Sequence, residues 1–169
     1  TAIRGFGLFR NKVYALRGSA IVRLGFNARK GEETLVEKGI FLENLFSGSE
    51  KYQIDFISNN KVCFFGERGE FFSNALPYRF VDAGVRGYQI ESDGRKVALW
   101  QGERVGVLDF EKPERKKEFF ERGPEIEWVF EKGKSIRQAY FVYEGAYIVF
   151  CDEDEIFLAR AGERDIPAE

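Results

Sequence analysis

The stretch YQIESDGRKVALWQGERVGVL, residues 88–108, indicates the fold class, because it consists of short apolar runs separated by two turns. The first turn contains Asp93-Gly94, a pair that favours a β-hairpin because glycine tolerates positive φ. Arg10-Asn11, Asn59-Asn60 and Glu144-Gly145 stand at similar places elsewhere in the chain. We therefore expect an all-β protein with about fourteen or fifteen short strands.

The same layout recurs along the chain. When the hairpins are aligned, Val13, Val62, Val97 and Ile148 occupy corresponding positions, with a spacing of 84 residues from Val13 to Val97 and of 86 from Val62 to Ile148. Self-similarity at a fixed period is typical of repeat architectures. We predict an internal duplication of two halves with two blade-like units each, followed by a polar tail; the segments are 1–84, 85–162 and 163–169.

Each predicted unit holds four strands, and a lone four-stranded sheet cannot cover both of its faces. Sheets that pack face to face around an axis solve this problem, as in a β-propeller. Gly5, Gly7 and Gly87 suit inner strands at such a crowded axis. Residues 111–122 fit either a short helix or an edge strand. The last unit lacks a convincing fourth strand, and residues 1–6 fit either that role or the inner strand of the first unit.

The third unit follows the pattern strand, S-D-G-R-K-V-A, strand, G-x-V-x-V-L-D. The residues that carry this pattern are Ser92, Asp93, Gly94, Lys96, Val97, Ala98, Val105, Val107, Leu108 and Asp109. In these residues the unit resembles the blades of WD40-like and TolB-like β-propellers, although the Gly-His and Trp-Asp signatures of WD40 repeats are absent. The resemblance implies a β-propeller-like array of about four blades.

Such an array has three possible states: a closed ring, a half-ring that pairs with a second copy, or part of a longer propeller. The alternative architecture is a pair of tandem β-barrel or β-sandwich domains, one for each duplicated half.

The composition excludes several classes of partner. The chain has 26 basic and 28 acidic residues, so its net charge of −2 gives no general attraction to nucleic acid. Apolar runs are too short for a membrane span, so we expect a soluble protein without membrane insertion; the compartment stays unknown, with the cytoplasm slightly favoured. Cys63 and Cys151 lie in apolar runs, which favours two buried thiols, although one disulfide is possible.

The sequence lacks the usual sets of catalytic residues. It contains no histidine, so it has neither a Ser-His-Asp triad nor a histidine zinc site. The two cysteines are far apart in sequence, and no phosphate-binding glycine motif opens a helix. We expect no cofactor, no metal and no catalytic residue, and we consider an enzyme the less favoured reading, although paired carboxylates could support glycosidase chemistry.

Charged turns between equivalent strands are the best candidates for a binding surface, because loops on a rigid scaffold commonly carry function. We predict a loop face formed by Arg17, Glu67, Arg68, Glu103, Arg104, Asp152 and Asp154. Arg68 and Arg104 are the first candidates, since a guanidinium makes bidentate contacts with carboxylates. Trp100 and Trp128 are assigned to packing.

The expected function is a non-enzymatic protein-interaction or assembly module, with a protein or a second copy of the chain as its partner. The alternative is a protein that binds or processes a small ligand or carbohydrate through Asp, Glu and Arg on the loop face.

Overall fold

The structure, a computed structural model, describes residues 2–18, 20–27, 32–41, 49–58, 61–73, 79–111 and 126–162, with backbone alone for 26–27, 32–41 and 79–82. The chain forms two compact units, Thr1–Ala83 and Gly84–Glu169. The described residues form fifteen strands and no helix, so they contain no helix able to cross a membrane. The expected helix or edge strand at 111–122, the Asn59-Asn60 turn and the tail 163–169 fall almost wholly outside the described residues.

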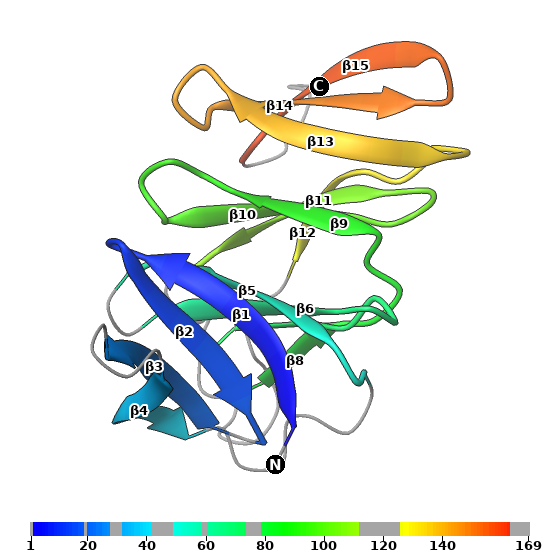
Figure 1. The fold of residues 1–169 in the computed structure, drawn as a ribbon. Coiled ribbons are helices and arrows are strands. Elements are labelled where there is room, and N and C mark those ends of the chain that lie inside the picture. Colours follow the sequence, from blue (N-terminus) through cyan, green and yellow to red (C-terminus); the bar gives the residue numbers. More distant parts are fainter. Residues whose placement is uncertain are drawn as a thin grey trace, which may run out of the picture. The chain divides into compact units, whose positions relative to one another are not determined.

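The first unit is one eight-stranded sheet in the order β4-β3-β2-β1-β5-β6-β7-β8 (Figure 1). Its strands are β1 (Ile3–Phe9), β2 (Lys12–Arg17), β3 (Ala20–Asn27), β4 (Glu32–Phe41), β5 (Tyr52–Phe56), β6 (Val62–Gly66), β7 (Phe71–Ser73) and β8 (Arg79–Asp82). Neighbours are antiparallel except at the centre, where β1 pairs in parallel with β5 over two residue pairs. The first two groups of four strands are therefore joined through their first strands. Of residues 1–6, residues 3–6 belong to β1, the inner strand of the first group.

Two glycines allow the close approach of β1 and β5. A β-carbon on Gly5 would overlap the carbonyl oxygen of Tyr52, and one on Gly7 would lie 2.6 Å from the carbonyl oxygen of Ile54. The two halves of the sheet meet in one core, which includes Leu16 and Ile21 from β2 and β3 and Phe64 from β6. Each fully buried apolar side chain stabilises the unit by roughly 1.5–3 kcal/mol.

The second unit contains two sheets, with orders β12-β11-β10-β9 and β13-β14-β15 (Figure 1). Their strands are β9 (Gly87–Ile90), β10 (Lys96–Trp100), β11 (Val105–Asp109), β12 (Glu127–Phe130), β13 (Ile136–Val142), β14 (Tyr147–Asp152) and β15 (Glu155–Arg160). β13 packs against β9 and β10. The shared core includes Ala98 and Val107 from one sheet and Ala139, Ile148 and Phe150 from the other.

The hairpin turns adopt the backbone that their sequences favour. Arg10 and Asn11, the two residues between β1 and β2, have φ of 48° and 62°. Gly94 has φ of 73° in the turn after β9. Val13, Val62, Val97 and Ile148 each lie in the second strand of their group.

Candidate functional site

The two Gly-Glu-Arg turns lie in different units and have different surroundings. In the first unit, the turn between β6 and β7 rests on Ser49, whose Oγ accepts a hydrogen bond of 3.0 Å from the backbone N–H of Arg68 and donates one to Glu70. The carboxylate of Glu67 accepts a hydrogen bond of 3.2 Å from the backbone N–H of Glu50. The side chain of Arg68 is exposed, and within the described residues no hydrogen bond or ion pair holds its guanidinium. Its position is therefore not fixed by the turn.

In the second unit, the guanidinium of Arg104 is held from two directions. It lies over the indole ring of Trp128, with 3.8 Å from Cζ to the ring centroid. Its Nε donates a hydrogen bond of 2.6 Å to Oε1 of Gln101. A guanidinium over an indole is attracted by the electrons of the ring, and the planar contact limits the rotation of the side chain. Arg104 is therefore preorganised, in contrast to Arg68.

Gly106 makes room for this stack. It pairs with Trp128 across β11 and β12, and a β-carbon at Gly106 would lie 2.8 Å from an atom of the indole ring. The indole of Trp128 therefore lies against the bare backbone at Gly106 and also beneath the guanidinium of Arg104.

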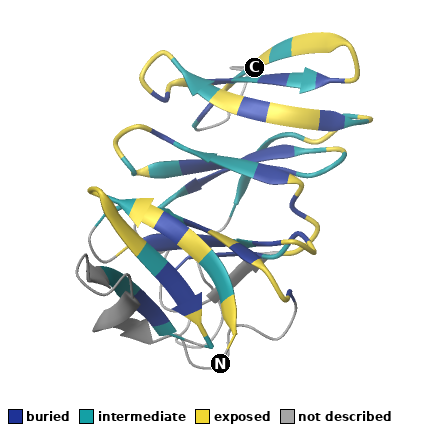
Figure 2. Ribbon diagram, in the orientation of Figure 1, coloured by how far each residue is buried: buried dark blue, intermediate teal, exposed yellow. Residues whose placement is uncertain are grey.

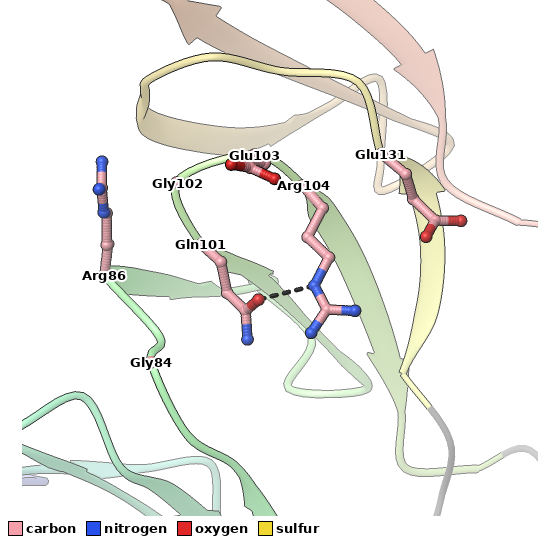
Figure 3. Close-up of a pocket in the computed structure, with 7 residues that line it drawn as sticks. All are labelled: Gly84, Arg86, Gln101, Gly102, Glu103, Arg104 and Glu131. Carbon is pink, nitrogen blue, oxygen red and sulfur yellow. Dashed lines mark hydrogen bonds between the residues drawn. The ribbon is translucent and has the colours of Figure 1, made fainter.

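The turn lines an open depression of about 600 Å³ (Figure 3). We call it the Arg104 pocket; its lining residues are Gly84, Arg86, Gln101, Gly102, Glu103, Arg104 and Glu131. Figure 3 shows the Gln101–Arg104 hydrogen bond at its centre, with Arg86 on one side of the turn and Glu131 on the other. Two guanidinium groups, one amide and two carboxylates thus surround the same space.

The two arginines differ in how they are supported. Arg86 is exposed, and its guanidinium lies beside Gly102, where an added β-carbon would be 3.0 Å from Nη2. Among the described residues, no ion pair involves Arg86, and the two Nη atoms of Arg104 have no hydrogen-bond acceptor. Both guanidinium groups therefore retain donors for an external anion, and guanidinium groups bind carboxylates and phosphates well.

Asp152 plays a different part, since it is buried and bonded to backbone. Its carboxylate accepts hydrogen bonds of 3.0 Å from the N–H of Lys134 and of 2.6 Å from that of Ser135. The same connecting segment bonds to the Gly-Glu-Arg turn, because the N–H of Gly133 donates to the carbonyl of Glu103 at 2.8 Å. Asp152 thus helps to position the wall of the pocket without lining it.

The structure describes all seven residues of the predicted loop face. Glu103 and Arg104 line the pocket, Asp152 supports the segment beside it, and Asp154 is exposed in the turn between β14 and β15. The remaining predicted residues belong to the other unit; they are Arg17, Glu67 and Arg68. Each group is described within its own unit, and the loop face as a whole stays a prediction.

Sequence reasoning did not select Arg86, Gln101 or Glu131, and it assigned Trp128 to packing alone. Trp128 is half-buried and also supports Arg104. The spacing of Gln101 and Arg104 across a tight turn was a usable signal. The position of Trp128 depends on the pairing of β11 with β12, which the local sequence does not encode.

The chemistry of the pocket is that of charged and amide groups. Within the described part of the chain, no three His, Cys, Asp or Glu side chains cluster in a way that could hold a metal ion. Burial raises the pKa of Glu91, with a smaller contribution from the neighbouring Asp93, but Glu91 does not line the pocket. The arrangement can bind an anion between Arg86 and Arg104 and accept hydrogen bonds at Glu103 and Glu131.

Comparison with known proteins supports the fold. No protein-family model and no curated protein sequence matches the chain. Among solved structures, it is similar to a putative 6-phosphogluconolactonase from Bacteroides uniformis ATCC 8492, with a TM-score of 0.53 and 13% identity over 95% of this chain and 51% of that chain. It is also similar to the Dos1 propeller, with a TM-score of 0.50 and 13% identity over 96% of this chain and 42% of that chain. The chain therefore spans about half the length of these structures, and it has an all-β, propeller-like fold.

Proposed function

We propose that the chain is a non-enzymatic protein-interaction module that binds a carboxylate of a partner protein in the Arg104 pocket. One observation carries the proposal: Arg104 is clamped by Trp128 and Gln101 while its two Nη atoms remain available within the described residues. A preorganised guanidinium loses little side-chain entropy when it binds, so more of the interaction energy appears as affinity.

Arg86 supports the choice of an acidic partner group. Its exposed guanidinium lines the same depression, so a carboxylate held by Arg104 would also experience the charge of Arg86. The rim carboxylates of Glu103 and Glu131 would disfavour highly charged anions by repulsion and would accept hydrogen bonds from backbone or hydroxyl donors of the partner. A peptide that presents one acidic side chain or a C-terminal carboxylate among neutral groups fits this pattern.

The second candidate is the binding of a small ligand or carbohydrate at the same pocket. Carboxylates beside arginines form a suitable set of acceptors and donors for a hydroxylated acid. One of the structures with a similar fold is described as a putative 6-phosphogluconolactonase, but that similarity concerns the fold alone.

Titration calorimetry with three probes separates these candidates: a neutral peptide ending in a free carboxylate, its C-terminally amidated form, and gluconate. We expect the peptide with the free carboxylate to bind. The amidated peptide should bind at least about tenfold more weakly, because amidation removes one charged hydrogen-bonded contact. Binding of gluconate alone would support the second candidate. Absence of binding by both peptides would overturn the first proposal.

Substitutions test whether peptide binding depends on the support of Arg104 by Trp128 and Gln101. Arg104→Lys keeps the charge but loses the planar fork, so it should weaken peptide binding, and Trp128→Leu should weaken it by freeing the guanidinium. Arg95→Lys is the matched control, because Arg95 is an exposed arginine that pairs with Glu111 at 3.3 Å and does not line the pocket. Equal loss in Arg95→Lys and Arg104→Lys would contradict a specific site.

A further inference from the structure

The turn between β13 and β14 has a strained backbone. Tyr143, Glu144 and Gly145 have φ of 51°, 55° and 76°, so three successive residues lie in the left-handed region. Side chains other than hydrogen make this region costly, and strained residues persist where the surrounding structure holds them. We call residues 143–146 the Tyr143 turn. Its conformation therefore depends on contacts with the rest of the second unit.

The Tyr143 turn meets the neighbouring sheet at Gly145. This glycine is buried and lies against the carboxylate of Glu91, which follows β9. Its carbonyl oxygen accepts a hydrogen bond of 3.3 Å from Nζ of Lys96, the first residue of β10. The ionisable side chains of the turn itself, Tyr143 and Glu144, are exposed (Figure 2). A carboxylate and an ammonium group of one hairpin thus contact the same residue of the turn.

Glu91 is poorly supported as a charged group. The residue is 8% exposed, and its Oε2 atom is buried without a hydrogen-bond partner in the described part of the chain. An ionised carboxylate in such a place loses hydration that no other contact replaces. Lys96 donates to the carbonyl of Gly145 instead, and it forms no ion pair with Glu91 among the described residues. This geometry therefore suits the neutral form of the Glu91 carboxyl group.

The charged groups that act on Glu91 belong to its own hairpin. Burial is the largest cause that raises the pKa of Glu91, and the negative charge of Asp93 adds to the shift. The positive charges of Lys96 and Arg95 oppose it. The contact with the turn thus favours the neutral carboxyl group, and the nearest cations do not cancel this preference.

We propose that the Tyr143 turn is a pH-sensitive latch between the two sheets of the second unit. The turn is seated while Glu91 is neutral, and ionisation of Glu91 releases it. In the released form the carboxylate binds the ammonium group of Lys96, which leaves the carbonyl of Gly145, and water reaches both charged groups. The strain in the turn favours release once these contacts are lost.

The direction of the response follows from the two forms. In acid, Glu91 is neutral whether the turn is seated or released, so pH does not change their balance. As the pH rises through the raised pKa of the seated form, ionisation favours the released form. The hairpin stays attached nearby, because the N–H of Phe141 donates a hydrogen bond of 2.9 Å to Oε1 of Gln89 without any ionisable group. The opening is therefore local, and it does not involve the Arg104 pocket, which Glu91 does not line.

Hydrogen–deuterium exchange of the full chain over a series of pH values tests the latch. The rate for residues 143–148 in the wild-type chain is divided by the rate in Glu91→Gln at the same pH, which cancels the chemical pH dependence of exchange. This ratio should be near one in acid and should rise at least about threefold at neutral pH, because glutamine does not ionise and keeps the turn seated. A ratio that stays constant with pH overturns the proposal.

Peptides from β10 distinguish local opening from global unfolding. The turn should exchange faster than β10, and low concentrations of urea should leave its rate unchanged, because a local opening exposes little surface. Equal rates with equal urea dependence in both segments would mean that the whole unit unfolds, and they would overturn the latch.

Two further variants identify the groups involved. Glu144→Gln is the matched control, because it removes a carboxylate from the same turn and leaves Glu91 in place; its pH response should equal that of the wild-type chain. Lys96→Met should move the rise to higher pH, because the charge of Lys96 favours ionised Glu91. Loss of the response in Glu144→Gln, or an unchanged pH of the rise in Lys96→Met, would contradict the proposed exchange of partners.

Discussion

The carboxylate of Glu91 lies directly against Gly145, so that a β-carbon at residue 145 would overlap Oε1 of Glu91. Gly145 belongs to the turn between β13 and β14, and Glu91 follows β9 in the adjacent sheet. The carbonyl of Gly145 also accepts a hydrogen bond of 3.3 Å from Nζ of Lys96. The two sheets of the second unit are therefore fitted together at this end by a glycine and a buried carboxylate.

Gly145→Ala should destabilise the second unit by about 2–4 kcal/mol, because it combines a positive φ of 76° with the overlap on Glu91. Gly84→Ala is the matched control: Gly84 has a φ of 72°, but no atom lies within 4 Å of an added β-carbon. That control should cost only about 1 kcal/mol. Urea unfolding of both variants measures the difference, and equal losses would show that the contact with Glu91 is not tight.

Glu91→Gln should change the pH dependence of stability. Burial raises the pKa of Glu91 above its ordinary value, with Asp93 adding to the shift and Lys96 opposing it. Below the ordinary glutamate pKa the carboxyl group is protonated in both the folded and the unfolded chain, so its raised pKa does not lower the free energy of unfolding there. As the pH rises through the raised pKa, the folded chain loses stability relative to the unfolded chain.

The glutamine variant lacks this titration. Its free energy of unfolding should therefore exceed that of the wild-type chain by an amount that grows as the pH rises through the weakly acidic range. The buried Oε2 of Glu91 has no hydrogen-bond partner among the described residues, which adds to the cost of its charge. Urea unfolding of both proteins at a series of pH values is the measurement. Parallel pH profiles for the two proteins would contradict the prediction.

Asp152→Ala should cost about 1–3 kcal/mol, because it leaves the N–H groups of Lys134 and Ser135 without their acceptor. Asp154→Ala is a close control, since Asp154 is exposed in the adjacent turn and makes no hydrogen bond within the described residues. Thermal unfolding compares the two variants. A larger loss in Asp154→Ala would mean that the acidic turn, rather than the buried carboxylate, stabilises this end of the unit.

The parts of the fold that the sequence predicted are those set by local rules. Arg10-Asn11 and Asp93-Gly94 form turns because Asn and Gly tolerate positive φ, and the strands between them follow from short apolar runs. The joining of β1 to β5 was not expected, because it depends on two segments far apart in sequence and on close backbone contact at Gly5. The sequence repeats predict separate four-stranded sheets, whereas the first two groups of strands share one sheet.

The candidate site was predictable in part for the same reason. Arg104 could be selected because its turn joins two strands that are adjacent in sequence. The support from Trp128 arises from the pairing of Gly106 with that residue, and Arg86 lies before β9 rather than in the turn. Pairings between segments distant in sequence determine which charged groups meet in the second unit, so sequence alone did not select Arg86 and Glu131.

The two cysteines should react with thiol reagents at very different rates. Cys63 is fully buried, and burial raises its pKa to about 12, so it offers almost no thiolate at neutral pH. Cys151 is half-buried on β14, and both residues are free thiols. Iodoacetamide followed by peptide mass analysis should modify Cys151 in the folded chain and Cys63 only after addition of urea. Early modification of Cys63 in the folded chain, at a rate near that of Cys151, would contradict its burial, because a fully buried thiol with a raised pKa offers the reagent neither access nor thiolate.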